Sequence, residues 1–462
     1  MALSQNWRQR VLMLCAMYVA QGLPWGFMVT ALVAYLTERG LDDVSTSDLT
    51  GVILLPWTFK LIWGPVIDTF TIRSMGRRRP WIIGSQFMMA VTLLGIIWLG
   101  NPDEQMTDAG DISPQYIRWL GLMFFIHNCF ASLQDVSTDA LAVDVLPPAE
   151  QGRVNGLMWG AKLFGKAIGA VVMAKVMSAG DAYRPGWGIP AAVLIQFVLL
   201  LGIMLFPLSM LERPGEKRFP WSRGGESAAE TGGNFRSPDF LLRDLVKGFS
   251  LVTTAALFVY GLLHVLGWGI VEVITKTLYT QQLDWGFEEF SYVTGFAVLA
   301  ELCGALAGGF LADLLGRRTV MVVGFGSYGL LHLIFAARPD LWDQTWFSAG
   351  YLFLNPGALA MGSVGFLSAA MNVSWTKSAA TMFTIYMTLS NVGHVVGNKL
   401  AGWLRGEEML GLTYESSFAI AGIVTIAPLV LVALVNPATV LAREAAEREE
   451  QANETVNGEE PV

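Results

Sequence analysis

The chain has 462 residues, of which 53% are hydrophobic and 15% are charged, and its formal net charge is -8 at pH 7. This composition excludes an ordinary soluble protein, and the length is sufficient for many membrane spans. No basic patch supports nucleic-acid binding. Cys15, Cys129 and Cys303 lie in apolar runs without a pairing pattern, so neither a disulfide framework nor a metal site is predicted.

Apolar stretches long enough to cross a bilayer as helices recur along the chain. The first begins near Val11 and has no small-residue cleavage pattern, so it is expected to be retained as a span. The sequence therefore predicts an all-α integral membrane protein with twelve transmembrane helices. Their expected ranges are 11–37, 46–70, 80–99, 115–146, 152–177, 187–211, 248–281, 287–314, 318–337, 345–372, 379–405 and 411–436.

The loops between these spans alternate in charge. One side collects most of the basic residues, which by the positive-inside rule makes it the cytoplasm and places both termini there. The polar segment 212–247 is expected to be a cytoplasmic linker between two six-helix bundles, 1–211 and 248–436, and the Glu-rich end 437–462 an acidic cytoplasmic tail. The basic residues outside the linker are Arg8, Arg10, Arg73, Arg77, Arg78, Arg79, Arg153, Arg317, Arg318 and Lys377.

The fourth span is unusual because Asp135, Asp139 and Asp144 interrupt an otherwise apolar helix. A charge at the bilayer centre costs roughly 2.5–3.5 kcal/mol on insertion scales, so an acid inside a membrane indicates a functional site. Asp135 and Asp139 are four residues apart and share a helical face, whereas Asp144 points elsewhere. This pattern predicts the polar centre of a transporter.

Several polar residues of other spans share the depth of Asp135. Counted from the predicted cytoplasmic end at about 1.5 Å per residue, Gln21, Lys60, Lys162 and Glu301 lie about 15–20 Å deep. Transporter sites are found near this midplane. We expect Lys60 or Lys162 to neutralise Asp135 or Asp139, and substrate or a proton to alter the pairing. The alternative is a permanent buried ion pair that fixes the register of the helices.

Further polar residues of the spans are candidates for substrate or proton coupling. Glu301 is expected to be an unpaired carboxyl that takes up a proton near neutral pH, and Glu272 and Lys276 are expected to pair with each other. His264 and His394 titrate in a useful range, although a lone membrane histidine often serves only as a hydrogen-bonding group between helices. The remaining candidates are Gln134 beside Asp135, Lys166 on the face of Lys162, and Asn391.

A repeated motif follows the second span of each predicted half. The C-terminal copy reads Gly308-Gly309-Phe310-Leu311-Ala312-Asp313-Leu314-Leu315-Gly316-Arg317-Arg318, and the N-terminal copy reads Gly64-Pro65-Val66-Ile67-Asp68, with Gly76-Arg77-Arg78-Arg79 after a longer loop. Both resemble the loop signature of the major facilitator superfamily. A small glycine lets helices approach, and an aspartate can hold loop arginines in a charge-assisted network. The predicted gating residues are Asp68, Arg77, Arg78, Asp144, Gly309, Asp313, Arg317 and Arg318; alternatively, the arginines only set topology.

A closer resemblance is carried by three stretches of the N-terminal half. These are Gln21-Gly22-Leu23-Pro24, Leu55-Pro56-Trp57-Thr58-Phe59-Lys60 continuing to Asp68, and Gln134-Asp135 through Asp139-Ala140 to Asp144-Val145-Leu146-Pro147. Together they resemble the AmpG-type muropeptide permeases and the related acetyl-CoA transporters. The resemblance implies two pseudo-symmetric six-helix bundles and a proton-driven carrier in which the acids of the fourth span matter. It leaves open whether the substrate is an anhydro-muropeptide, a CoA ester or a siderophore.

The sequence thus favours a secondary transporter and not an enzyme. Its two bundles would rock around a site at the membrane midplane. The protein is expected to work as a monomer in the bacterial inner membrane. Its expected partners are a small-molecule substrate, protons and the bilayer, and no cofactor is expected. The sequence contains no Gly-x-x-x-x-Gly-Lys-Ser/Thr loop, so nothing in it indicates ATP use. The alternatives are a non-transporting assembly or pigment-delivery factor, and an acyltransferase with His127 or His264 as base. Direction of transport, proton stoichiometry and the acid that carries the proton stay open.

Overall fold

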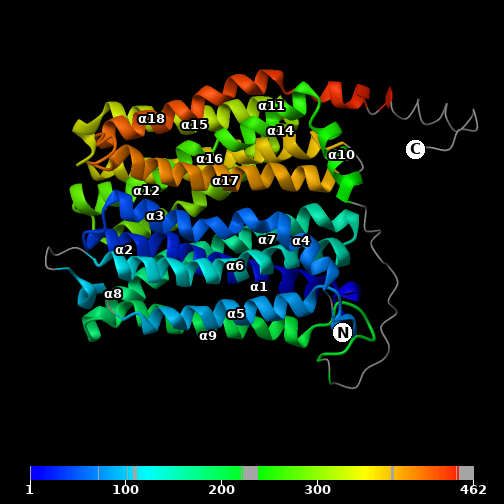
Figure 1. Ribbon diagram of the computed structural model, residues 1–462, viewed down its shortest axis with the longest axis horizontal. Coiled ribbons are helices and arrows are strands. Elements are labelled where there is room, and N and C mark those ends of the chain that lie inside the picture. Colours follow the sequence, from blue (N-terminus) through cyan, green and yellow to red (C-terminus); the bar gives the residue numbers. More distant parts are fainter. Residues whose placement is uncertain are drawn as a thin grey trace, which may run out of the picture.

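The chain is a bundle of long, nearly parallel helices in the computed structural model, with the N-terminal half below the C-terminal half in Figure 1. The structure describes residues 2–443, except 71, 101, 108–111, 220, 222–237 and 376–378, together with 445 and 446. Lys377, the linker residues 220 and 222–237, and most of the predicted tail therefore lie outside the described residues, as do the side chains of Asp68 and Arg73. The described part contains helices and turns but no β-strand.

The N-terminal half consists of helices that end or change pitch at several points. It contains α1 (Trp7–Trp25), the π-helical η2 (Gly26–Leu32), α2 (Val33–Glu38), α3 (Asp43–Leu54), the 3-10 turn η3 (Leu55–Phe59), α4 (Lys60–Thr69), α5 (Arg79–Trp98), α6 (Pro114–Val145), α7 (Pro148–Ala167), η6 (Ile168–Val172), α8 (Met173–Tyr183) and α9 (Gly188–Ser209).

The C-terminal half follows the same plan. It contains α10 (Pro238–Gly248), α11 (Val252–Leu263), α12 (Leu266–Thr277), η7 (Leu278–Gln282), α13 (Phe287–Phe296), α14 (Val298–Leu315), α15 (Arg317–Ala337), α16 (Thr345–Val373), α17 (Ala379–Arg405), α18 (Tyr414–Ile426) and η9 (Ala427–Leu434). The remaining elements are the short turns η1 (Leu3–Gln5), η4 (Arg73–Met75), η5 (Pro102–Gln105) and η8 (Pro339–Leu341).

The predicted all-helical membrane fold is confirmed. Ten helical stretches of the described residues are long and apolar enough to cross a membrane. The other two predicted spans coincide with α6 and α17, which are 32 and 27 residues long. Both helices carry several of the polar residues singled out above, such as Asp135 and His394. The division of the chain at 211, 247 and 436 stays a prediction.

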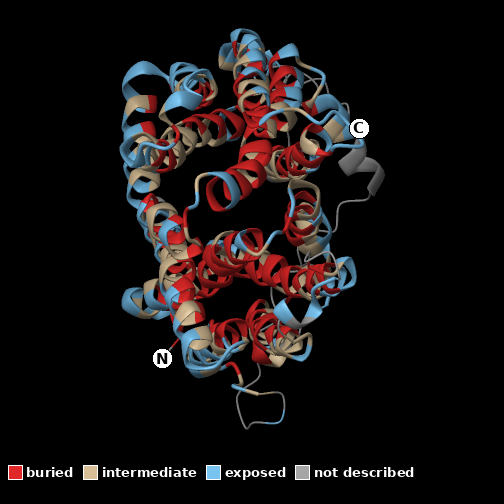
Figure 2. Cartoon of the chain, turned by 90° about the vertical axis from the view of Figure 1, so that its left-hand side faces the viewer, coloured by how far each residue is buried: buried red, intermediate tan, exposed pale blue. Residues whose placement is uncertain are grey.

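Burial follows the faces of these helices. Figure 2 shows that buried residues line the inward faces within each half, while exposed residues lie on the outside. Large apolar side chains such as Trp98, Val143 and Phe310 are exposed there. A bilayer would cover this outer surface, since lipid replaces water as the solvent of a membrane span.

Glycines bring α1 and α7 into backbone contact. A Cβ atom added at Gly22 would lie 2.0 Å from the carbonyl oxygen of Lys162, and one added at Gly26 would lie 2.0 Å from that of Lys166. On the facing helix, a Cβ atom at Gly169 would meet the Leu23 carbonyl at 2.1 Å. Small residues four apart allow such an approach in membrane helices. The contact places both lysines of α7 beside α1.

We expect Gly22→Ala to destabilise the protein, because the added methyl group overlaps the α7 backbone and overpacking typically costs about 1–3 kcal/mol. The measurement is the thermal unfolding midpoint in detergent. Gly160→Ala on α7 is the matched control, since a Cβ atom there meets nothing within 4 Å. Equal unfolding midpoints for the two variants would contradict the close contact.

Candidate functional site

The acid of α6 that the sequence singled out first, Asp135, holds two lysines. Lys60, the first residue of α4, donates a short hydrogen bond to Asp135 Oδ2, and Lys162 Nζ lies 3.5 Å from Oδ1. The Asp135 side chain is 3% exposed, and those of Lys60 and Lys162 are 14% and 15% exposed. The structure therefore brings two cations to one buried carboxylate.

Asp139 lies one helical turn from Asp135 and has a different partner. The hydroxyl of Tyr18 on α1 donates a hydrogen bond of 2.5 Å to Asp139 Oδ1. Two acids on one helical face thus differ in environment, because one is held by cations and the other by a neutral donor. We call Tyr18, Lys60, Asp135, Asp139 and Lys162 the acid cluster.

The predicted glutamines lie behind the acid cluster. Gln21 Nε2 donates to Gln134 Oε1 at 2.7 Å, and Gln134 Nε2 donates to Gln86 Oε1 on α5 at 3.3 Å. All three side chains are buried. This chain of amides joins α1, α6 and α5, so it fixes the position of the helix that carries the acids.

Aromatic rings surround the ammonium group of Lys162. Its Nζ lies 4.9 Å from the ring centroid of Trp57, 5.6 Å from Tyr18, and 5.8 Å from both Trp25 and Trp159. An ammonium within about 6 Å of an aromatic face is attracted by the ring quadrupole. Four aromatic rings therefore border the Lys162 ammonium in addition to the Asp135 carboxylate at 3.5 Å.

Lys166 connects the two halves of the molecule. Its Nζ lies 2.8 Å from Glu301 Oε2 on α14. The expectation that Glu301 is unpaired is wrong, because α14 of the C-terminal half packs near α7 of the N-terminal half. Asn391 also crosses between the halves, and its Nδ2 donates to the Trp57 carbonyl oxygen at 3.0 Å.

Glu272 on α12 pairs with a histidine. His394 Nε2 on α17 lies 2.8 Å from Glu272 Oε2. The expected pairing of the Glu272 carboxylate with Lys276 is wrong, because Lys276 Nζ donates to the backbone carbonyl of Glu272 instead. The spacing of four residues does bring Lys276 close to the backbone of Glu272, but the Glu272 carboxylate faces α17.

His264 lies apart from these groups. Its Nδ1 is 2.9 Å from the Tyr260 carbonyl oxygen one turn earlier, and its ring packs against Phe325 and Phe366. The side chain is buried in the apolar interior of the C-terminal half. This environment fits the structural role that the sequence left open for a lone membrane histidine.

One of the predicted gating contacts, between Arg78 and Asp144, is formed in the structure. Arg78 Nε lies 3.0 Å from Asp144 Oδ2 at the end of α6. The C-terminal copy of the motif differs: Arg317 Nε donates to Ser368 Oγ at 3.2 Å, and Arg318 Nη2 donates to the Ala433 carbonyl at 2.7 Å.

The expected pairing of Asp313 with these arginines is therefore not formed among the described residues, because the arginines extend toward α16 and η9. Gly309 also differs from its expected role, since a Cβ atom there would meet nothing within 4 Å. The close approach occurs at the preceding residue, where a Cβ atom at Gly308 would lie 2.9 Å from the Met361 carbonyl.

A carboxylate that the sequence did not single out supports the N-terminal arginine loop. Glu212, just after α9, accepts hydrogen bonds from the backbone N–H groups of Arg77 at 3.0 Å, Arg78 at 2.8 Å and Arg79. An anion at the first turn of α5 complements the unpaired N–H groups and the helix dipole. Gly76 permits this approach, because its φ is +106° and a Cβ atom would lie 2.7 Å from the carboxylate.

Arg79 fixes the same segment from the other side. Its guanidinium is fully buried and donates to backbone carbonyls of α9 and of the residues that follow it, including Lys217 at 2.9 Å and Arg218 at 3.0 Å. Glu216 Oε2 in turn accepts from the Glu212 N–H at 2.9 Å. The start of the predicted linker is thus bound to the arginine loop.

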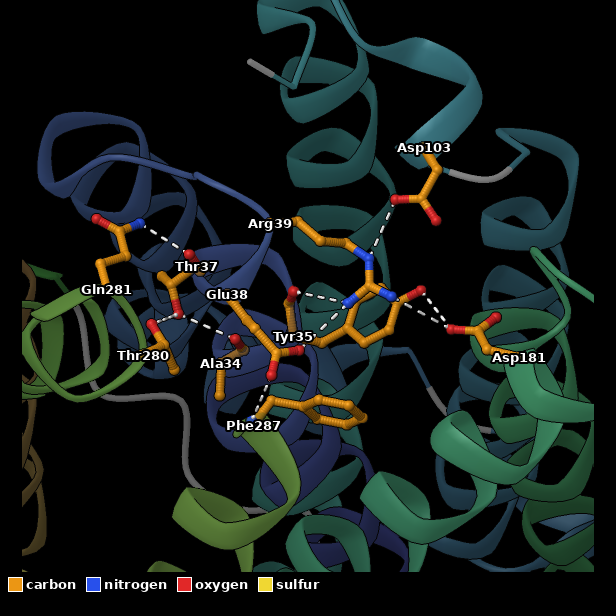
Figure 3. A network of polar contacts seen from close by, with 10 residues as sticks. All are labelled: Ala34, Tyr35, Thr37, Glu38, Arg39, Asp103, Asp181, Thr280, Gln281 and Phe287. Atoms are coloured by element: carbon orange, nitrogen blue, oxygen red, sulfur yellow. Dashed lines mark hydrogen bonds and ion pairs between the residues drawn. The ribbon is translucent and has the colours of Figure 1, made fainter. Parts of the chain in front are cut away.

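At the opposite end of the helices, hydrogen bonds join the two halves. Gln281 Nε2 donates to the carbonyl oxygens of Thr37 at 2.7 Å and Leu41 at 2.9 Å, and Thr280 Oγ1 lies 2.9 Å from Thr37 Oγ1. Glu38 Oε1 accepts from the Phe287 N–H at 3.2 Å. Figure 3 shows Thr280, Gln281 and Phe287 converging on the last turn of α2. We call this group the Thr37 contact.

Arg39 anchors the Thr37 contact within its own half. Its guanidinium lies 3.5 Å from the centroid of the Tyr35 ring, between Asp103 and Asp181 (Figure 3). The distances are 3.1 Å from Nε to Asp103 Oδ1 and 3.5 Å from Nη2 to Asp181 Oδ2. The end of α2 is therefore held rigidly where it meets the other half.

A second junction at this end centres on Asp43, the first residue of α3. Its Oδ2 lies 2.7 Å from Arg405 Nε and 3.1 Å from the Tyr414 hydroxyl, and its Oδ1 accepts from Thr277. One carboxylate of the N-terminal half thus binds three helical segments of the C-terminal half. The sequence did not single out Asp43.

The comparisons with known proteins agree with this architecture. The family profile described as acetyl-coenzyme A transporter 1 matches residues 10–173, and that of the Major Facilitator Superfamily matches residues 257–458. The anhydromuropeptide permease of Escherichia coli (strain K12) is 25% identical over 400 residues, which cover 83% of this chain and 72% of that protein. Each half of the chain is thus similar to a family of membrane transporters, and the chain as a whole is similar to a permease.

Solved structures show the same fold. The crystal structure of the nucleoside transporter NupG matches with a TM-score of 0.66 at 15% identity, over 92% of this chain and 100% of that one. The resemblance to the major facilitator superfamily, the AmpG-type permeases and the acetyl-CoA transporters is thereby confirmed. These relatives are permeases and transporters and not enzymes, and the chain is a multi-pass membrane protein.

We expect the stability of the arginine loop to depend on pH through Glu216. Burial, with the negative charge of Glu212 second, raises the pKa of Glu216 from 4.5 to about 7. Because the folded chain holds this proton more tightly than the unfolded chain, the contribution to stability is full below pH 4.5 and is lost as the pH rises through about 7.

The measurement is the thermal unfolding midpoint between pH 4.5 and 8, and the midpoint should fall less with pH in Glu216→Gln than in the wild-type protein. Glu407→Gln, at an exposed position, is the control that should keep the wild-type slope. Parallel pH profiles for all three proteins would contradict the assignment.

Proposed function

We propose that this protein is a proton-coupled secondary transporter that moves a polar small molecule, such as an anhydro-muropeptide or a related amphiphilic solute, by alternating access. The acid cluster is the observation that carries the proposal. Two lysines and two carboxylates lie along helices that cross the membrane, with Asp135 buried and Asp139 exposed. Charged groups in a membrane span are costly unless they serve a substrate or ion pathway. A scaffold or pigment-delivery factor would not need them.

The distribution of contacts between the halves supports alternating access. The Thr37 contact and the Asp43 junction close one end of the helices. With the termini and the arginine loop in the cytoplasm, as the positive-inside rule predicts, this closed end faces outward. The present arrangement then corresponds to an inward-facing state, and rocking of the halves would break the contacts at Thr37 and Asp43.

The surroundings of Lys162 support an anionic solute with a ring. Its ammonium has a single carboxylate partner at 3.5 Å and is bordered by aromatic faces. Carboxylates of a peptide bind ammonium groups, and sugar rings pack on tryptophan. Both occur in an anhydro-muropeptide, the substrate named for the relative in Escherichia coli. A siderophore or a CoA ester would also bring anionic groups and remains the alternative.

Asp139 is the proposed proton carrier of the N-terminal half. Its hydrogen bond comes from the neutral Tyr18 hydroxyl, so the carboxyl can take up a proton without abandoning a buried lysine. Asp135 is proposed to stay charged between Lys60 and Lys162. The pair Arg78–Asp144 is proposed to hold the arginine loop within its own half in the inward-facing state.

The proposal is tested by uptake into proteoliposomes under an imposed pH gradient, with anhydro-muropeptide, a CoA ester and a siderophore as substrates. We expect anhydro-muropeptide to accumulate at least tenfold above protein-free vesicles. Asp139→Asn keeps the shape of the side chain and should abolish pH-driven accumulation while leaving counterflow. Asp340→Asn, an exposed position paired with Arg338, is the control. Absence of transport for every substrate would favour the assembly-factor alternative.

A disulfide across the Thr37 contact should stop transport. Thr37 Oγ1 and Thr280 Oγ1 are 2.9 Å apart and belong to different halves, so Thr37→Cys with Thr280→Cys can form a bridge between them. We expect oxidation to lower uptake at least tenfold and reduction to restore it. The two single variants, treated in the same way, are the controls. Unchanged uptake in the oxidised double variant would mean that this end does not open.

A further inference from the structure

The pair Glu272–His394 lies where two helices of the C-terminal half are held close together. A Cβ atom at Gly269 on α12 would lie 2.4 Å from the His394 carbonyl, and one at Gly397 on α17 would lie 2.3 Å from the Leu266 carbonyl. This backbone contact brings His394 Nε2 to 2.8 Å from the Glu272 carboxylate. The side chains are 6% and 13% exposed, so water is largely excluded from the pair.

His394 differs from the other three histidines of the chain. His127 and His264 have their Nδ1 atoms near backbone carbonyls, and His332 Nδ1 is 2.9 Å from the Tyr351 hydroxyl. Each of those contacts can be made by a neutral imidazole. Among the described residues, His394 is the histidine that meets a carboxylate. An imidazole beside a carboxylate gains a strong charge-assisted bond when it binds a proton.

The charged neighbours of the pair connect it to the other half. Lys276 Nζ donates to the Glu272 backbone carbonyl, and its charge acts on the Glu272 carboxylate more strongly than that of Lys166. Tyr328 on α15 also interacts electrostatically with Glu272. Lys166 on α7 also acts electrostatically on Glu272, while its own ion pair is with Glu301 at 2.8 Å. Lys166 is therefore a cation of the N-terminal half that lies within the influence of two carboxylates of the C-terminal half.

We propose that Glu272 and His394 form a proton-binding site whose occupancy decides whether Lys166 stays paired with Glu301 across the two halves. With a proton on His394, Glu272 has its own cation and Lys166 remains on Glu301. When the proton leaves, Glu272 keeps only the nearby charge of Lys276, whose ammonium is held by a backbone carbonyl, and the carboxylate competes for Lys166. The inference rests on the proposed proton coupling and assigns a second site to it, in the half opposite to Asp139.

Trp268 provides a probe of this site that needs no substrate. Its ring is stacked on His394 with 3.7 Å between centroids and 14° between planes. A protonated imidazole quenches the fluorescence of a stacked indole more strongly than a neutral one. The difference in emission between the wild-type protein and Trp268→Phe, measured on the full chain in nanodiscs from pH 5 to 9, isolates this one tryptophan.

We expect the Trp268 emission to fall in a single titration step as the pH is lowered. His394→Gln should remove the step, and the isosteric Glu272→Gln should displace it, because the imidazolium loses its opposite charge. His264→Gln is the matched control, since that ring stacks on Tyr260 and should leave the step unchanged. A step that persists in His394→Gln, or the absence of any step, would overturn the proton-binding site.

Transport measurements separate this inference from the proposed function. Suppose that wild-type uptake depends on the pH gradient and that both Glu272→Gln and His394→Gln keep the wild-type pH profile. The proposed link to Lys166 is then wrong, even if the fluorescence step is present. If the wild-type protein transports none of the tested substrates, the proposed function fails while the fluorescence step still decides the binding site. Flattened pH profiles in both variants, with counterflow retained, are the expected result.

Discussion

The fold of the N-terminal half depends on Asp135. A buried charge needs a partner of opposite charge, and the Asp135 carboxylate is the partner of both Lys60 and Lys162. Removing one member of such a group leaves an unpaired buried charge and typically costs about 3–5 kcal/mol. The requirement restricts the fold: α4 must begin at Lys60 beside α6, and α7 must lie beside α1. Glycines at the α1–α7 contact allow the second condition to be met.

The need of a buried charge for a partner also applies in the C-terminal half, where we propose that Glu272 and Glu301 compete for Lys166. Lys166 joins the halves through Glu301, and Glu272 is paired within its half by His394. Rocking of the halves would separate Lys166 from Glu301 and would strand two charges if nothing replaced them. A nearby carboxylate that becomes available when a proton leaves offers such a replacement. In the proposed cycle, proton binding and the opening of the interface are linked by this exchange.

The sequence predicted those features that follow from local pattern. Apolar length predicted twelve spans, and ten helical stretches of the described residues are long and apolar enough to cross a membrane. The spacing of Asp135 and Asp139 predicted that both acids share one face of the helix. The prediction failed where a partner comes from a distant helix: an interval of four residues suggested Lys276 for Glu272, although α17 supplies His394. Glu212 was missed because it acts on backbone N–H groups, which no side-chain pattern reveals.

The two ends of the molecule differ in how their polar groups are satisfied. At the Thr37 contact and at Asp43, groups of one half are satisfied by the other half, so opening that end requires water to replace several hydrogen bonds. At the arginine loop, Arg78, Arg79 and Glu212 are satisfied by their own half. Thr37 and Thr280 are buried, and the side chains of the Asp43–Arg405 pair are 10% and 17% exposed, against 30% and 15% for Lys166 and Glu301. Opening the interface therefore separates two ion pairs that are largely shielded from water, and the charges of both need compensating partners.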